Sequence, residues 1–585
     1  MTPVYSFFWR RVLGALLLSG LLGLVAHAQP AALQPVLLAR AAGTGSADIA
    51  ALAATSGGDY YVAGNFTGSI TVGTVPLSST GGTDAFVARC QAGTGAVQWV
   101  LPLTGPVEEQ ITCLSWHNNA LYVGGRFRSA RLTLDGQTIA NADPANIGSR
   151  DGFVAKITDQ GTRGRVVWAY DLGGATEDYV TALAGNGDRV YVGGTFDSPS
   201  ISLAGTPLDN SQPRPATLAT TDGFVAALLD LGATAAVSWV LPAAGVGREE
   251  VTALAVSGPT VYVGGTHTSV GGSLSQLGSI SLAPAGRPAA FVGRVQDGLQ
   301  TANPVWVEEL RGSGPVFLSA LALLPGSVYV SGTFEGVTDT LPIGPDILTN
   351  AGNTDGYLAR LDDAGATASW AWGRHASGWG YEGLQALATD GKSIYAAGRF
   401  NSPTLTLGST VLPNPLPAPG VGLDAFVTRL TTSGTFVETQ AIAGDGNALA
   451  HAVLAIGSQL YLGGSFGGNA TFGSQLLTSA SNAGYVASVA FRPLGGRAGA
   501  ALPGLALAPN PASGRAELRL PAGSGAAPFS ISMLDALGRV VRRREVAATA
   551  GGQTIMLELA GLAPGVYAVR VQQGAAQAVQ KLVVE

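Results

Sequence analysis

The chain has 585 residues, a net charge of -6 and charged side chains at only 12% of its positions, while glycine accounts for 83 residues. The acidic balance argues against a general nucleic-acid-binding surface, which needs concentrated positive charge. Few charges and many glycines favour short strands joined by tight turns, because glycine adopts positive φ at little cost.

The N-terminus has the pattern of a secretory signal peptide. An arginine pair precedes an apolar run over residues 12–25, and the small-x-small cleavage pattern Ala-His-Ala follows at residues 26–28. No later stretch is apolar and long enough to span a bilayer. We therefore expect residues 1–28 to be removed and the mature chain to be secreted or held at the outer cell surface, without a transmembrane segment.

One short motif recurs seven times and organises most of the chain. Its commonest form is Tyr-Val-x-Gly-x-Phe, and successive copies are 61 to 71 residues apart. Repetition at such a period indicates an array of one structural unit. The seven tyrosines are Tyr61, Tyr122, Tyr191, Tyr262, Tyr329, Tyr395 and Tyr461.

Each repeat reads as about four strands without helical periodicity between them. An apolar strand and a short turn precede the tyrosine strand, which predicts a hairpin. An alternating segment, an Asp-x-Phe strand and a strand centred on tryptophan, such as Trp168, follow. A four-stranded sheet cannot bury both of its faces alone, and radial packing solves that problem. We therefore predict an all-β fold, with a seven-bladed β-propeller over residues 29–493.

The ends of the array indicate how such a ring closes. Residues 36–41 have the position of a tryptophan strand but precede the first apolar strand, whereas the seventh copy lacks a tryptophan strand. We expect the N-terminal strand to complete the last blade. The Tyr-Val-x-Gly-x-Phe and Asp-x-Phe-Val-Ala-Arg/Lys strands resemble the SBBP β-propeller repeat of secreted bacterial proteins. The resemblance implies a fold but no particular activity.

The composition changes near the C-terminus. Residues 494–504 read as a Gly/Ala/Pro-rich linker. About six short strands follow in residues 505–585, which predicts a small antiparallel β-sandwich of immunoglobulin-like type.

Four motifs stand in order in this C-terminal segment. They are Ala-Pro-Asn-Pro at 508–511, Asp-Ala-Leu-Gly-Arg-Val-Val at 535–541, Leu-Ala-Pro-Gly-Val-Tyr at 562–567 and Lys-Leu-Val-Val-Glu at 581–585. Together they resemble the type A C-terminal sorting domain of the type IX secretion system of Bacteroidetes. The resemblance implies a partner in the type IX machinery, export across the outer membrane, removal of this domain, and release or surface attachment.

Acidic residues precede the apolar strand in most repeats. If these strand starts face one mouth of the channel, their carboxylates form an incomplete ring that could hold a cation or a basic ligand. The alternative, which we favour, is that they bond turn backbone or pair with a neighbouring blade. The candidates for the ring are Asp48, Glu109, Asp178, Glu250 and Glu382.

The other patterns indicate structural roles. Residues 463–467 match Gly-x-Ser-x-Gly, but a nucleophile needs that motif in a strand–turn–helix elbow. An Asp precedes the Phe strand in five of the repeats, and the aromatics have fixed places in the strands, which favours packing. Cys90 and Cys113 are interpreted as buried thiols, with a disulfide as the alternative. We predict no catalytic residue, cofactor or metal ligand.

These observations favour a non-catalytic binding or structural module. Its glycan or protein ligand would bind a propeller face or the channel mouth, where loops differ between copies. The alternative is an extracellular glycan hydrolase or lyase on the same scaffold, which would need two carboxylates at a defined separation.

Overall fold

The computed structural model contains strands and turns and no helix among the residues it describes, so none of them forms a helix that could span a membrane. The chain divides into two compact units, residues 1–491 and 492–585. The predicted signal peptide (1–28) and linker (494–504) lie outside the described residues. The described residues are 33–146, 149–211, 220–269, 271–414, 422–489, 505–522, 528–535, 540–549, 551–573 and 576–585.

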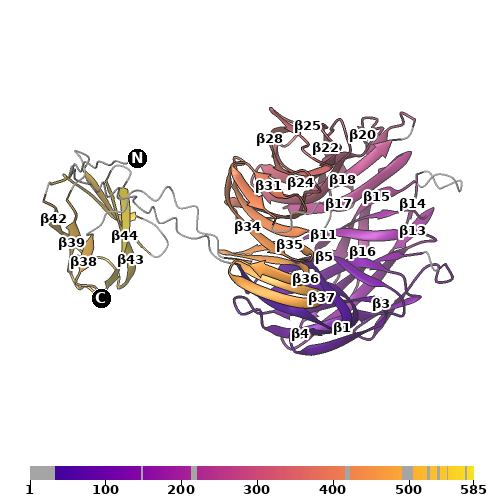
Figure 1. Cartoon of the computed structure of the whole chain (residues 1–585), viewed down its shortest axis with the longest axis horizontal. Coiled ribbons are helices and arrows are strands. Elements are labelled where there is room, and N and C mark those ends of the chain that lie inside the picture. Colours follow the sequence, from indigo (N-terminus) through magenta and orange to yellow (C-terminus); the bar gives the residue numbers. More distant parts are fainter. Residues whose placement is uncertain are drawn as a thin grey trace, which may run out of the picture. The chain divides into compact units, whose positions relative to one another are not determined.

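The first unit is built from successive four-stranded groups that are arranged around a common centre (Figure 1). In each group the apolar strand pairs with the tyrosine strand, which pairs with the Asp-x-Phe strand, and a fourth strand completes the sheet. All of these pairings are antiparallel. The predicted all-β class and the order of strands within a repeat are therefore confirmed.

The strand bounds follow the repeat. The first strands are β1 (Gln34–Ala54), β5 (Glu109–His117), β11 (Asp178–Asn186), β17 (Gly247–Ser257), β23 (Val316–Leu324), β29 (Gly383–Thr389) and β35 (Ala448–Ile456). The second strands are β2 (Tyr60–Val72), β6 (Ala120–Phe127), β12 (Arg189–Phe196), β18 (Thr260–Ser269), β24 (Ser327–Glu335), β30 (Ser393–Phe400) and β36 (Gln459–Phe472). The third strands are β3 (Val75–Cys90), β9 (Asp151–Asp159), β15 (Asp222–Asp230), β21 (Ala289–Asp297), β27 (Thr354–Asp363), β33 (Asp424–Thr431) and β37 (Gln475–Val489). The fourth strands are β4 (Val97–Thr104), β10 (Gly164–Gly173), β16 (Ala235–Ala244), β22 (Ala302–Leu310), β28 (Ala368–Ser377) and β34 (Phe436–Gly444).

The alternating segment forms a hairpin that ties neighbouring groups together. In four of the hairpins the first strand pairs with the fourth strand of the preceding group, as Leu103 with Leu134 and Leu172 with Leu203. The hairpin at residues 340–349 forms a two-stranded sheet of its own. This extra hairpin accounts for the long repeat period. The separate hairpins are β7 (Arg131–Leu134) with β8 (Gln137–Ala140), β13 (Ser200–Leu203) with β14 (Thr206–Asp209), β19 (Ser275–Leu277) with β20 (Ile280–Leu282), β25 (Thr340–Ile343) with β26 (Asp346–Thr349), and β31 (Thr404–Leu407) with β32 (Thr410–Pro413).

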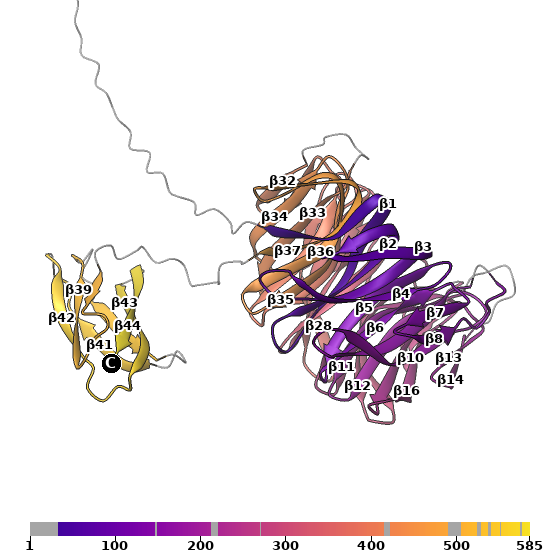
Figure 2. The same cartoon turned by 90° about the horizontal axis from the view of Figure 1, so that it is seen from below.

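Strand β1 belongs to two groups at once. Its first part pairs with β37, from Gln34 opposite Ser488 to Ala39 opposite Gly484, and its later part pairs with β2. The first strands contact one another in the order β1, β5, β11, β17, β23, β29, β35 and again β1. The expected pairing of the N-terminal strand with the last repeat is thus confirmed, and Figure 2 shows indigo β1 beside orange β37.

The glycine of the tyrosine motif is required by close packing within each group. A Cβ on Gly125 would lie 2.0 Å from the carbonyl oxygen of Gln110 and 2.8 Å from the ring of Phe153. Gly194 meets Tyr179 and Phe224 in the same way. The glycine of the Tyr-Val-x-Gly-x-Phe motif and the phenylalanine of the Asp-x-Phe motif therefore occur together. The phenylalanine ring fills the space that a side chain at the glycine position would need.

The recurring tyrosine and tryptophan bind an aspartate of the next group. Tyr122 donates to Asp230 at 2.6 Å, Trp168 Nε1 donates to the same carboxylate at 3.3 Å, and Lys156 Nζ lies 2.6 Å from it. Asp230 ends the third strand of the following group, β15. Three further junctions repeat this arrangement through Asp159, Asp297 and Asp363.

We expect Asp230→Ala to lower the free energy of unfolding by about 3–5 kcal/mol, because the change leaves a buried ammonium without its counter-ion and two buried donors without their acceptor. Tyr122→Phe removes one donor only and should cost about 1 kcal/mol. Denaturant unfolding of the two variants, with the exposed Asp188→Ala as control, measures the difference. Equal losses in Asp230→Ala and Asp188→Ala would contradict the junction's role.

The second unit is a small sandwich of two antiparallel sheets. One sheet has the order β38 (Ala506–Ala508), β39 (Arg515–Leu520), β42 (Gln553–Glu558), and the other has the order β41 (Val540–Val546), β40 (Phe529–Leu534), β43 (Gly565–Gln573), β44 (Ala576–Val584). Both sheets contribute to one apolar core, which includes Leu518, Leu557, Phe529 and Val569.

Candidate functional site

The acidic residues at the strand starts lie at junctions between neighbouring groups. At four junctions the aspartate of the Asp-x-Phe strand faces a second carboxyl group, which lies at or near the start of the next group's first strand. The pairs are Asp84 with Glu109, Asp151 with Asp178, Asp222 with Glu249, and Asp355 with Glu382.

The first junction shows how such a pair is held. Asp84 accepts hydrogen bonds from the backbone N–H groups of Thr80, at 2.7 Å, and Gly105, at 3.1 Å. Glu109 is only 1% exposed, and its carboxyl group lies beside Asp84 and Ser129. A proton on Glu109 would let it donate a hydrogen bond to Asp84. A Cβ on Gly105 would lie 2.5 Å from both Glu109 Oε1 and Ser129 Oγ, so a side chain at this position would displace both groups.

A serine from the hairpin region completes the other three junctions. Ser198 Oγ donates to Asp178 at 2.7 Å, Ser275 Oγ donates to Glu249 at 2.7 Å, and Ser402 Oγ donates to Glu382. Each junction therefore combines two buried carboxyl groups with one hydroxyl donor, and the three residues come from two adjacent groups.

Burial makes these carboxyl groups weak acids. Desolvation, with a contribution from the neighbouring aspartate, raises the pKa of Glu109 and of Glu249 to about 8 and that of Asp178 and Glu382 to about 7. At neutral pH Glu109 and Glu249 are consequently mostly protonated, and Asp178 and Glu382 are partly protonated.

The five predicted ring residues fall into two classes. Glu109, Asp178 and Glu382 are buried between groups. Glu250 and Asp48 are partly exposed, and each has a basic neighbour, with Glu250 Oε1 2.5 Å from Arg248 Nε and Asp48 Oδ1 3.3 Å from His451 Nε2. No three of these five carboxyl groups gather into a cluster that could hold a metal ion.

Comparison of the repeats could have shown that the third-strand aspartate and the acidic residue at the start of the next first strand occur together. Where alanine replaces the third-strand aspartate, as at Ala289, the following first strand begins with an apolar residue, Val316. This pattern does not choose between the adjacent acids Glu249 and Glu250, and the structure shows that Glu249 faces Asp222. One repeat departs from the pattern, because Asp424 precedes a group that begins with Ala448.

Two exposed aromatic side chains lie beside the junction that contains Glu382. The side chains of Trp379 and Tyr381 are on the turn between β28 and β29, and the residues are 68% and 57% exposed. Their backbone is held, because Gly380 N donates to Ser402 Oγ at 2.6 Å and Tyr381 N to Asn401 Oδ1 at 2.8 Å. Sequence reasoning missed this pair, although both aromatics lie outside the recurring packing positions.

The other sequence candidates have structural positions. Ser465 is a buried residue within strand β36, so Gly-x-Ser-x-Gly does not form a nucleophile elbow. Cys90 and Cys113 are free thiols, as we favoured. In the described part of the chain, no group of three or more His, Cys, Asp or Glu side chains could hold a metal ion.

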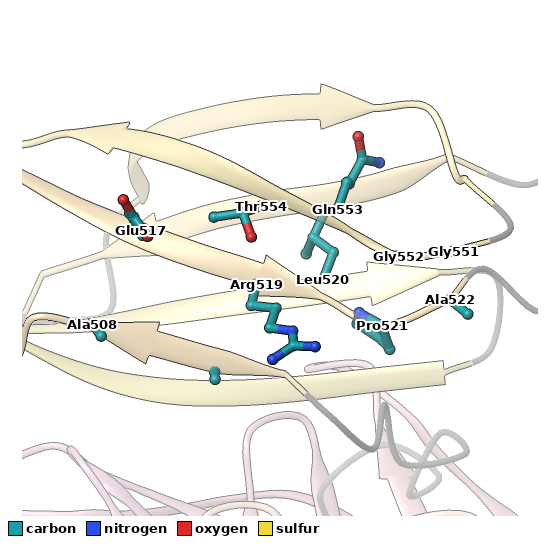
Figure 3. Close-up of a pocket in the computed structure, with 11 residues that line it drawn as sticks. Ala508, Glu517, Arg519, Leu520, Pro521, Ala522, Gly551, Gly552, Gln553 and Thr554 are labelled. Atoms are coloured by element: carbon teal, nitrogen blue, oxygen red, sulfur yellow. The ribbon is translucent and has the colours of Figure 1, made fainter.

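The C-terminal unit has a concavity of about 830 Å³ on the sheet formed by β38, β39 and β42. Figure 3 shows Glu517, Arg519 and Thr554 over this surface and Ala508 at its side. The lining combines small residues with one acidic and one basic side chain, without a cluster suited to catalysis.

Comparison with known proteins assigns this unit. Residues 506–585 match the Secretion system C-terminal sorting domain family. The sorting domain directs export by type IX secretion, so the protein reaches the cell surface or the exterior. The N-terminal signal peptide remains a prediction.

Other similarities concern the longer part of the chain. Regulatory protein FlaEY of Caulobacter vibrioides is 27% identical over 309 residues, which are 50% of this chain and 29% of that protein. The chain thus spans less than a third of that relative. Among solved structures, PorZ, a surface component of the type IX secretion system of Porphyromonas gingivalis, aligns at 12% identity over 92% of this chain and 93% of its own, with a TM-score of 0.15. Trypanosoma rangeli sialidase aligns at 10% identity over 84% and 86% of the two chains, with a TM-score of 0.30. Scores this low carry no argument about function.

Proposed function

We propose that the first unit is a seven-bladed β-propeller of the SBBP type and that the sorting domain is an immunoglobulin-like sandwich. The closed order of first-strand contacts and the double role of β1 support the ring. Two antiparallel sheets around one core support the sandwich.

We propose that the exported propeller is a non-catalytic binding module whose ligand is a glycan. The observation that carries this proposal is the exposure of Trp379 and Tyr381 on a turn with a fixed backbone. Large exposed aromatics on a rigid support indicate a contact surface, because their rings give broad apolar area at a low entropic cost. Flat rings suit the apolar faces of sugars, and the neighbouring backbone does not need to reorganise on binding.

The use of the acidic residues supports a non-catalytic role. The recurrent buried carboxyl groups are engaged at group junctions, and Glu250 has an ion-pair partner. A glycan hydrolase would need two carboxyl groups that face a bound sugar, with one of them ionised.

A glycan array probed with the mature chain tests the proposal. We expect binding of a subset of glycans, and a loss of at least ~10-fold in affinity for the double variant Trp379→Ala/Tyr381→Ala, as expected when central aromatic contacts are truncated. Val337→Ala, another exposed apolar position, is the matched control. Glycan binding that the double variant leaves unchanged would contradict this site. Breakdown of a polysaccharide by the chain would favour the hydrolase or lyase.

A further inference from the structure

The sorting domain is open along one side of its sandwich. Strand β41 is the outermost strand of one sheet, and β42 is the outermost strand of the other. Residues of both strands line a cavity of about 380 Å³. Neither strand has a paired neighbour on its outer side among the described residues, so each presents unpaired backbone groups there.

The floor of this opening is apolar. Ile531, Met533, Met556 and Leu557 line it, and Ile531 and Met533 are only 3% exposed because they also belong to the core of the domain. The cavity therefore reaches the interior of the sandwich, where it would accept apolar side chains.

The rim of the opening carries three basic side chains and one acidic side chain, Glu558, so it has an excess of positive charge. Three consecutive arginines, Arg542 to Arg544, lie on β41. Arg542 donates to the carbonyl oxygen of Ala560, and Arg544 Nη1 donates to that of Met556 at 3.3 Å. Met556 is on β42 and Ala560 follows it, so these two bonds hold the guanidinium groups beside the opening.

We propose that an extended acidic segment of a partner protein in the export machinery binds in this opening as an added strand. Unpaired sheet edges accept such strands through main-chain hydrogen bonds, and alternate side chains give specificity. Inward side chains would cover the apolar floor, while carboxylates would pair with the arginines, whose planar guanidinium groups bind carboxylates with two parallel bonds. The proposal uses the sorting role of the domain and is independent of the glycan site.

A synthetic peptide of alternating residues, (Glu-Val)5, is a direct probe. We expect the full chain to bind it and not (Lys-Val)5, and the double reversal Arg542→Glu/Arg544→Glu to weaken binding at least ~10-fold. The matched control, Arg515→Glu/Arg519→Glu, makes the same charge change on β39 and should stay within about 2-fold of wild type. Fluorescence anisotropy at low ionic strength gives the affinities. Equal binding of the two peptides, or equal losses in the two double variants, would overturn the proposal.

A second readout is the fraction of chain exported by cells with an active type IX system. The reversal in the opening should lower export by at least ~10-fold, and the control should not. Arg543→Glu serves if the double variant fails to fold, because Arg543 does not make either carbonyl bond. Normal export of a folded Arg542→Glu/Arg544→Glu chain would overturn the assignment to the machinery. A variant that has lost glycan binding, such as Trp379→Ala/Tyr381→Ala, should still bind the peptide and be exported as the wild type is.

Discussion

Deletion of residues 35–42 is expected to lower the midpoint of thermal unfolding by roughly 10 °C or more. These residues include the part of β1 that pairs with β37 and the part that pairs with the outer end of β2. Their loss removes the fourth strand of the last group and exposes the edge of β37. It also uncovers buried apolar surface, since Leu38 packs with Tyr461 and Val486 of the last group.

A pair of single substitutions tests the same contact in the full-length chain. Leu38→Asp places a charge at a position that is 2% exposed, whereas Arg40→Asp alters an exposed position on the same strand. Calorimetry should show a large decrease for the first and little change for the second. A melting midpoint unchanged by the deletion would show that the pairing of β1 with β37 does not stabilise the first unit.

The second large effect is a loss of stability at alkaline pH. Glu109 and Glu249 have a pKa near 4.5 when unfolded and about 8 in the folded chain. A raised folded-state pKa gives stability that is complete below the unfolded pKa and is lost as the pH rises through the folded pKa. The free energy of unfolding should therefore fall between about pH 4.5 and pH 8, by a few kcal/mol for the junctions together.

The opposite trend is expected in acid. Tyrosine, tryptophan and cationic partners lower the pKa of Asp230, despite its partial burial, and similar bonds do so for Asp159 and Asp297. A lowered folded-state pKa gives stability above the unfolded pKa that is lost as the pH falls through the folded value. Stability should accordingly peak at mildly acidic pH.

Amide variants separate the junctions from other titrating groups. Glu109→Gln and Glu249→Gln keep a neutral donor at the junction, so at pH 9 these variants should be more stable than the wild type by about 1–3 kcal/mol. Glu250→Gln, at the partly exposed neighbouring position, should leave the pH dependence unchanged. Denaturant unfolding from pH 4 to pH 9 measures these differences, and parallel curves for wild type and Glu109→Gln would contradict proton sharing.

Much of the fold could be predicted because the constraints are local and repeated. The glycine of the tyrosine strand and the phenylalanine of the Asp-x-Phe strand fill one space in every group, so both recur in sequence. The closing strand was predictable because one strand is missing at the C-terminal end of the array and one is in excess at its start.

The candidate sites were less accessible to sequence reasoning. The difference between Glu249 and Glu250 depends on strand register, because adjacent residues face opposite sides of a sheet. Asp230 was missed because its partners, Tyr122 and Trp168, are 108 and 62 residues away and belong to another group. Trp379 and Tyr381 have no counterparts in the other repeats, so comparison of the repeats could not show whether they are buried or exposed.

The dual pairing of β1 also bears on the order of events during folding. Gln34 pairs with Ser488, so the closing contact joins positions about 450 residues apart, and the entropy of bringing such distant positions together slows assembly. Every other group of strands can form as soon as its own repeat has been synthesised. The pairing of β1 with β37 cannot form until the last repeat has been synthesised. A circular permutant with residues 33–42 moved behind β37 would make that contact local and should refold faster to the same structure.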